Sequence, residues 1–188
     1  LKHLPVKDCL PFKAGNNILE LRKMPKDAVP DKFDYKFVYK KNGESKEFAV
    51  SVLPDSSWEF VERKQVLIEK GKNNIPLIND FVLKTENEND TTEAILNQAG
   101  EYYLLLAKDF NKEDKWYDAF KLFYAKRTLP VFLVTSDPGT AKKIFAIPGL
   151  VILSCDATAL KTAARVNPTL YFMKGPVVKS KTAFMDFW

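Results

Sequence analysis

The sequence lacks the residue patterns on which most catalytic centres depend. Its 188 residues include one histidine, His3, and two cysteines, Cys9 and Cys155, which are far apart in the chain. Without a Cys-x-x-Cys motif, neighbouring cysteines form neither a dithiol redox centre nor a zinc knuckle. A disulfide between Cys9 and Cys155 stays open, but two separate thiols are favoured, because a disulfide requires close Cα atoms. A device built on His3 would use a residue at a chain end, where fraying is expected.

Other absences exclude further classes of site. The seven glycines are isolated, which excludes a phosphate-binding loop and a dinucleotide fingerprint. The acidic stretch 86–90 lacks the glycine and final glutamate of an EF-hand, so a solvated turn is the better interpretation. We therefore expect no metal and no cofactor. No run reaches the roughly 18 apolar residues of a membrane-spanning helix. Because the chain opens on Leu1 without a signal-like segment, we expect a piece of a longer protein.

The charge is spread rather than clustered. The net charge of +5 comes mainly from scattered lysines, and no run clusters arginine with lysine. Nucleic-acid-binding proteins instead gather arginine and lysine on one face. We expect a solvated lysine surface and no nucleic-acid partner.

The first part of the chain, residues 1–73, is expected to form a β-rich segment. Phe33, Tyr35, Phe37 and Tyr39 alternate with polar residues, which is typical of a half-buried strand. Asn42-Gly43 then favours a type I′ turn, and residues 46–52 are the expected return strand. Residues around 58–60 and 66–68 suggest further strands.

Residues 74–188 are expected to form a separate α/β domain. Strands are predicted over 80–85, 102–107, 130–135, 151–154 and 170–173, with 177–178 pairing as a hairpin. Helices are predicted between them: Trp116, Phe120, Phe123 and Tyr124 share one helical face and are expected in the core. Ser136 or Asp137 and then Asp156 are expected helix caps. Alternating strands and helices indicate β-α-β units in three layers.

Three stretches resemble the peroxiredoxin and TlpA-like branch of the thioredoxin superfamily. They are residues 75–83 (IPLINDFVL) followed by 100–106 (GEYYLLL), residues 131–137 (VFLVTSD), and residues 155–169, which run through a helix into Asn167-Pro168-Thr169. The resemblance covers residues 74–188. It implies a thioredoxin-like fold in which Pro168 is cis and, with Asn167 and Thr169, lines a groove for an extended partner peptide.

A narrower resemblance concerns residues 8–18 (DCLPFKAGNNI), the Asn42-Gly43 hairpin and residues 163–178 (AARVNPTLYFMKGPVV). These are similar to the soluble C-terminal region of DoxX-like membrane proteins of Bacteroidetes-type bacteria. This implies a multi-helix membrane domain upstream of Leu1 in the same polypeptide. It also implies attachment to the inner membrane, with the periplasmic and cytoplasmic sides both open.

One stretch departs from the thioredoxin-like pattern. Active members carry a nucleophilic cysteine at a helix N-terminus just after the strand that ends near Ala107. Here residues 108–116 read KDFNKEDKW and contain no cysteine. We therefore expect no dithiol exchange at this position. The sequence favours a non-catalytic role over that of an enzyme.

Three hypotheses for function follow. The first is a non-catalytic docking or assembly domain in a redox-associated membrane complex. The second is a thiol redox protein that acts through Cys155, with or without Cys9, although Cys155 after a buried strand and Cys9 in a proline-rich segment are both typical of packed small hydrophobes. The third is a small-molecule or peptide-binding module at the Pro168 groove.

Overall fold

The computed structural model describes residues 3–4, 10–111 and 115–186. The chain divides into two compact units, of which one is Met24–Pro76 and the other combines Leu1–Lys23 with Leu77–Trp188. The first unit ends close to the boundary expected at residue 73. Its start differs from the expectation, because the first 23 residues group with the α/β unit instead of the β-rich segment.

Backbone hydrogen bonds explain why the N-terminal residues join the α/β unit. The Gly15 N–H donates to the carbonyl of Val178 over 2.8 Å, and the Val178 N–H donates to the carbonyl of Asn16 over 3.0 Å. The ring of Phe12 is buried and meets Phe81 edge-on, with 5.1 Å between the ring centroids. The N-terminal segment therefore lines the edge of the larger sheet and contributes to its core.

The α/β fold class expected from the sequence is confirmed. The larger unit contains a five-stranded sheet in the order β6-β5-β4-β7-β8. Strands β4, β5 and β6 are parallel to one another, whereas β7 is antiparallel to β4 and β8 is antiparallel to β7. The strand bounds are β4 Glu101–Ala107, β5 Val131–Thr135, β6 Val151–Ser154, β7 Thr169–Lys174 and β8 Val177–Ala183.

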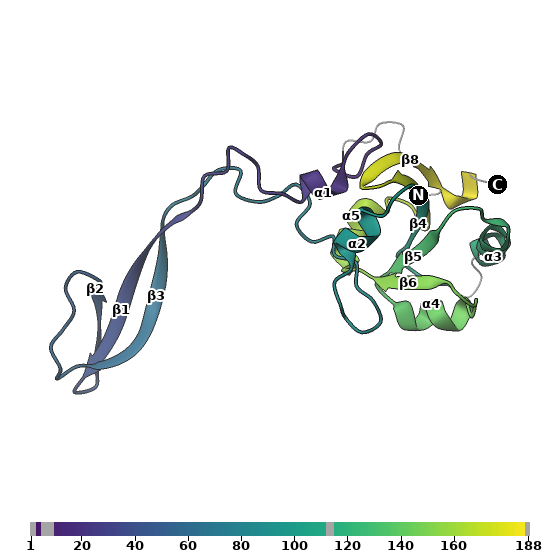
Figure 1. Ribbon diagram of the computed structural model, residues 1–188. Helices are drawn as coiled ribbons and strands as arrows, with labels where there is room; N and C mark the ends of the chain where they lie inside the picture. Colours follow the sequence, from purple (N-terminus) through teal and green to yellow (C-terminus); the bar gives the residue numbers. More distant parts are fainter. Residues whose placement is uncertain (1–2, 5–9, 112–114, 187–188) are drawn as a thin grey trace. The chain divides into compact units, whose positions relative to one another are not determined.

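Helices cover both faces of this sheet, which gives three layers (Figure 1). The helix bounds are α1 Ile18–Leu21, α2 Thr92–Leu96, α3 Trp116–Lys126, α4 Pro138–Ile144, α5 Ala157–Ala163 and the 3-10 helix η1 Phe184–Asp186. On one face, Leu104 and Leu106 of β4 pack in a core cluster with Leu160 of α5. On the other, Leu105 packs with Phe120 of α3. This alternation follows from successive strand side chains pointing to opposite faces.

The smaller unit is one antiparallel sheet in the order β2-β1-β3. Its strands are β1 Lys32–Lys41, β2 Glu44–Ala49 and β3 Glu59–Glu69. The turn between β1 and β2 contains Asn42 and Gly43 at φ angles of 50° and 88°, the positive values that a type I′ turn requires. The predicted hairpin is therefore confirmed, although its return strand ends at Ala49, short of the expected residue 52.

Two local predictions have different outcomes. The strand predicted over 80–85 is absent from these described residues; only Lys84 pairs, by isolated bridges to Asp90 and Ser154. Leu83 points into the core instead, since the segment packs under the sheet as a loop. The expected caps are confirmed: the Asp137 carboxylate accepts from the N–H of Thr140, and Asp156 accepts from the N–H groups of Thr158 and Ala159.

Candidate functional site

The corner formed by Asn167, Pro168 and Thr169 leads into β7. The Asn167–Pro168 peptide bond is cis, as the resemblance implied. Pro168 and Thr169 are buried, and Asn167 is half-buried. The Pro168 carbonyl accepts from the N–H of Phe184 over 3.2 Å, and the Thr169 hydroxyl donates to the carbonyl of Val166 over 2.8 Å. Two of the three residues expected to line a groove are therefore enclosed by the fold.

The side chain of Asn167 holds the chain that follows β4. Its Oδ1 accepts from the N–H of Lys108 over 2.7 Å, and its Nδ2 donates to the carbonyl of Asp109 over 2.8 Å. The family pattern places the nucleophile in this stretch, of which residues 112–114 lie outside the described residues. The side-chain amide of Asn167, which faces this stretch, thus binds the backbone of Lys108 and Asp109. Among the described residues of the stretch there is no thiol for it to face.

The start of α3 is enclosed in an aromatic cluster. Trp116 is buried and lies 5.3 Å from Phe145 and 6.2 Å from Phe184, measured between ring centroids. Its indole N–H has no hydrogen-bond partner in the described part of the chain. The core role predicted for Trp116, Phe120 and Tyr124 is confirmed by their burial. Phe123, predicted with them, is only half-buried and packs against the rim of the same cluster.

Cys155 follows β6 and is a free, buried thiol with 7% of its surface exposed. Burial raises the pKa of this thiol to about 12, and the carboxylates of Asp156 and Asp80 act in the same direction. The backbone N–H of Val82 opposes them by hydrogen bonding. The thiol is therefore protonated at neutral pH, whereas a nucleophilic cysteine needs the thiolate. Cys9 lies outside the described residues, so its expected role stays a prediction.

A cleft that the sequence does not predict runs along the edge strand β6. Its volume is about 570 Å³, and apolar side chains from the α4–β6 connection, including Phe145 and Ile147, together with those of β6 itself form most of its lining. An ion pair between Lys142 and Glu86 lies at this cleft. The lining residues bring no thiol to it, and Cys155 and the Pro168 corner do not contribute to it.

The smaller unit carries a second candidate site, which we call the aromatic face: Phe33, Tyr35, Phe37, Tyr39, Phe48, Trp58, Phe60 and Leu67. Alternation along β1, with the pairing of Phe37 to Phe48 and of Phe33 to Leu67, places these side chains on one side of the sheet. Phe60 meets Tyr39 with 5.6 Å between ring centroids, and Phe48 meets Trp58 at 5.2 Å. Ring contacts thus run in a continuous row from Phe37 through Phe60, Tyr39 and Phe48 to Trp58, across all three strands.

Much of this row faces solvent. Phe60 keeps 53%, Leu67 48% and Phe33 43% of its surface exposed. Residues 24–76, all of which the structure describes, contain no helix and no second sheet. Monomeric soluble proteins seldom expose contiguous apolar surface of this kind, and where they do it commonly marks an interaction site. The aromatic face is therefore a candidate docking surface.

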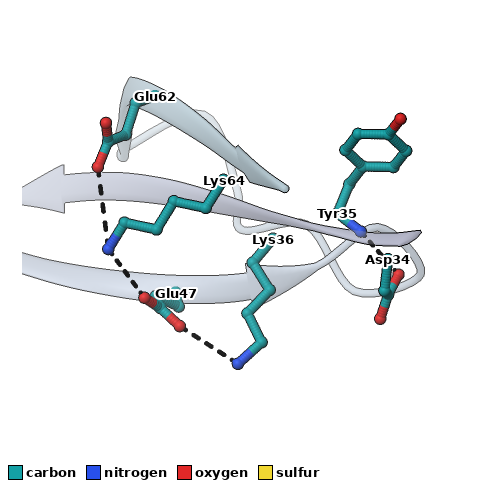
Figure 2. Close-up of polar contacts among 6 residues, drawn as sticks. All are labelled: Asp34, Tyr35, Lys36, Glu47, Glu62 and Lys64. Atoms are coloured by element: carbon teal, nitrogen blue, oxygen red, sulfur yellow. Dashed lines mark hydrogen bonds and ion pairs between the residues drawn. The ribbon is translucent and has the colours of Figure 1, made fainter. Parts of the chain in front are cut away.

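The opposite face of the same sheet is an ion-pair network. Glu47 binds Lys64 over 3.0 Å and Lys36 over 3.3 Å, and Lys64 also lies 3.8 Å from Glu62 (Figure 2). These side chains surround Val38, which is buried. Long aliphatic stems cover apolar surface while their charged ends stay in water. This face is therefore closed by its own side chains, whereas the aromatic face is open.

The sequence predicts the aromatic strand, but it does not predict that one face of the sheet is open to solvent. The alternation of Phe33 to Tyr39 predicts a half-buried strand, and such a strand is expected to lie on a core. The signal against a core is in β3, where Glu59, Glu62, Arg63 and Lys64 put charges on both sides of the strand. A sheet with charges on both faces of an edge strand has no fully apolar side to bury.

Comparison with known proteins bears on this smaller unit. A family model described as a domain of unknown function (DUF8463) matches residues 33–70. The matched range coincides with the three-stranded sheet, from the second residue of β1 to just past the end of β3. No curated protein matches the chain. Over its three-stranded sheet, the chain is thus similar to this domain of unknown function.

Proposed function

We propose that the chain is a non-catalytic docking or assembly domain, with a thioredoxin-like α/β unit, of a DoxX-like membrane protein. The observation that carries the proposal is the set of contacts at the Pro168 corner. There Asn167 binds the backbone of Lys108 and Asp109, in the stretch where active relatives present a thiol. The strand order and directions of the larger sheet agree with the resemblance, as does the cis bond before Pro168. A fold that keeps this corner without its nucleophile is suited to binding rather than to disulfide exchange.

The membrane part of the proposal rests on the resemblance alone. No helix in the described part of the chain is long and apolar enough to span a bilayer. The resemblance, and not this finding, assigns the proposed membrane domain to the same polypeptide upstream of Leu1, in an inner-membrane, redox-associated complex. The encoded sequence before Leu1 tests this. Several hydrophobic spans support it, and their lysine and arginine bias assigns the membrane side.

Redox chemistry through Cys155, with or without Cys9, is the competing function. The burial of Cys155 and its raised pKa count against it. A binding groove at Pro168 is a third candidate, and the burial of Pro168 and Thr169 counts against a deep groove there.

Alkylation kinetics test the proposal against redox chemistry. In a Cys9→Ser variant, we expect iodoacetamide at about pH 8 to modify Cys155 about 100-fold or more slowly than in the denatured chain, because the folded thiol stays protonated. The denatured chain of the same variant is the matched control. Modification of the folded protein at the denatured rate, or a Cys9–Cys155 disulfide in the wild-type chain by non-reducing mass measurement, would contradict the non-catalytic role.

A further inference from the structure

The aromatic face belongs to a sheet that has no second layer of its own. A sheet with an apolar side normally buries it against a helix or another sheet. Residues 24–76, which the structure describes throughout, form one sheet only. Phe60, at 53% exposed, lies near the middle of the ring row, in contact with both Phe37 and Tyr39. An occupant that covers this row would bury its exposed apolar surface.

Charge is distributed unequally between the two faces. The aromatic face carries Lys41, Lys46 and Arg63: Nζ of Lys46 lies 5.7 Å and that of Lys41 5.9 Å from the Trp58 ring centroid, and Cζ of Arg63 lies 4.8 Å from that of Tyr35. Glu44, beside the turn, is the one carboxylate among the described strand residues of this face. The other carboxylates of the strands lie on the opposite face, where Glu47 and Glu62 pair with lysines.

This distribution selects among occupants. A second copy laid on the aromatic face would bring two sets of these cations together, and like charges across an interface are unfavourable. A partner with carboxylates would instead meet Lys46 and Arg63 at the two ends of the ring row. The charge complementarity therefore favours an acidic partner over self-association.

Ring geometry separates an acidic polypeptide from a nucleic acid. Single-stranded nucleic acids bind by stacking bases on open, flat ring faces. Here a cation already lies over the rings at which a base would stack: Arg63 over Tyr35, and Lys41 and Lys46 over Trp58. Neighbouring rings also stand edge to face, with interplanar angles of 86° for Tyr39–Phe48 and 75° for Phe48–Trp58. Such a surface is ridged and accepts side chains between its rings.

We propose that the aromatic face docks a polypeptide segment of a partner protein that combines apolar side chains with aspartate or glutamate. The apolar side chains insert between the rings of the aromatic face, and the carboxylates pair with Arg63 and Lys46. The proposal rests on the docking role proposed above and specifies its surface and partner class.

Selection of peptides on the full chain tests this surface. The probe is a phage-displayed library of random twelve-residue peptides, with the Phe60→Ala variant used for counter-selection. We expect the peptides retained by the wild-type chain to carry net negative charge and apolar residues. A synthetic copy should bind at least about tenfold more weakly to Phe60→Ala and to Arg63→Glu, as expected for a central aromatic anchor and a paired charge.

Matched controls lie on the opposite face of the same sheet. Val66 is 36% exposed and pairs with Asp34 across the strands, and Lys40 pairs with Glu59. Val66→Ala and Lys40→Glu should each change the affinity by less than about twofold. Phe33→Ala, on the same face and 43% exposed, supplies a second test if Phe60→Ala fails to fold by circular dichroism.

Several results would overturn the inference. They are selected peptides that are neutral or basic, peptides that bind Phe60→Ala as well as the wild type, and no selection at all. A Phe60-dependent dimer in sedimentation would identify a second copy as the occupant. Arg63-dependent binding of a thymidine oligonucleotide would identify nucleic acid. None of these results implies faster alkylation of Cys155, which is the measurement that tests the non-catalytic role. Failure of this inference is therefore distinguishable from failure of that role.

Discussion

Asn167 uses one side-chain amide in two directions. Its oxygen accepts from the N–H of Lys108 over 2.7 Å and from that of Asp109 over 3.4 Å, and its nitrogen donates to the carbonyl of Asp109 over 2.8 Å. Three hydrogen bonds thus hold the chain after β4. An amide satisfies backbone donors and a backbone acceptor at once, whereas a carboxylate accepts but cannot donate. Asn167 therefore fixes the backbone of a segment that is distant in sequence. A local sequence pattern does not reveal this role.

Removal of this amide should destabilise the α/β unit. We predict that Asn167→Ala lowers the free energy of unfolding by about 1–3 kcal/mol, because its three hydrogen bonds are lost and the backbone groups of Lys108 and Asp109 are left without this partner. Asn167→Asp should lower it by an intermediate amount. Guanidinium unfolding followed by fluorescence measures both. Asn97→Ala, at an exposed position after α2, is the control; a loss no larger than in this control would contradict the assigned role.

At the scale of elements, the N-terminal segment is part of the larger unit. Phe12 is buried against Phe81, and the backbone of residues 15–18 pairs with the start of β8. The edge of the sheet is thereby covered at this end. Edge strands left unpaired are sites of aggregation, so this cover protects β8 as well as contributing to the core.

Truncation of Phe12 tests the grouping of this segment. We predict that Phe12→Ala lowers the free energy of unfolding of the larger unit by about 3–5 kcal/mol, the usual cost of deleting a buried phenyl ring. The neighbouring Lys13→Ala, at an exposed position, should change it by less than about 0.5 kcal/mol. Equal effects of the two variants in denaturant unfolding would show that the segment does not pack on the sheet.

The ion pairs of the smaller sheet give it a pH-dependent element. Hydrogen bonds from Lys64 and then Lys36 hold the pKa of Glu47 below its ordinary value of 4.5. Because the folded pKa is lowered, the contribution to stability is present above that ordinary value and is lost as the pH falls through the lowered pKa. The groups are exposed, so salt screens the effect.

A carboxyl titration measures this element directly. We predict by nuclear magnetic resonance that Glu47 titrates below 4.5 in the wild-type chain and returns toward that value in Lys64→Met, since the leading hydrogen-bond donor is removed. Lys70→Met, whose lysine makes none of these contacts, should leave the Glu47 pKa unchanged. An unshifted Glu47 in the wild type would show that the network of Figure 2 does not persist in solution.

At the scale of the whole molecule, the α/β pattern was readable from the sequence because its signals are local. The apolar run 102–107, the caps Asp137 and Asp156 and the Asn42-Gly43 turn each act over a few residues. The hydrogen bonds of Asn167 to Lys108 and Asp109 join residues 58 or more positions apart. The burial of Cys155 likewise depends on packing that no local pattern records, and so does the open side of the smaller sheet.

The account joins two features of the molecule. The α/β unit keeps the proline corner and closes it with Asn167, and the smaller unit exposes a ring row flanked by cations. Neither feature supplies an activated thiol among the described residues, and the second offers a surface for a partner. We therefore interpret the chain as a domain that binds other polypeptides, in keeping with the docking role proposed above.

Reduction of insulin in the presence of dithiothreitol tests this central claim most directly. The wild-type chain and a Cys9→Ser/Cys155→Ser variant are compared with dithiothreitol alone. The account predicts the same rate in all three, because the stretch 108–116 contains no cysteine and the thiol of Cys155 is buried and protonated. A wild-type rate above that of dithiothreitol alone that disappears in the double variant would contradict it.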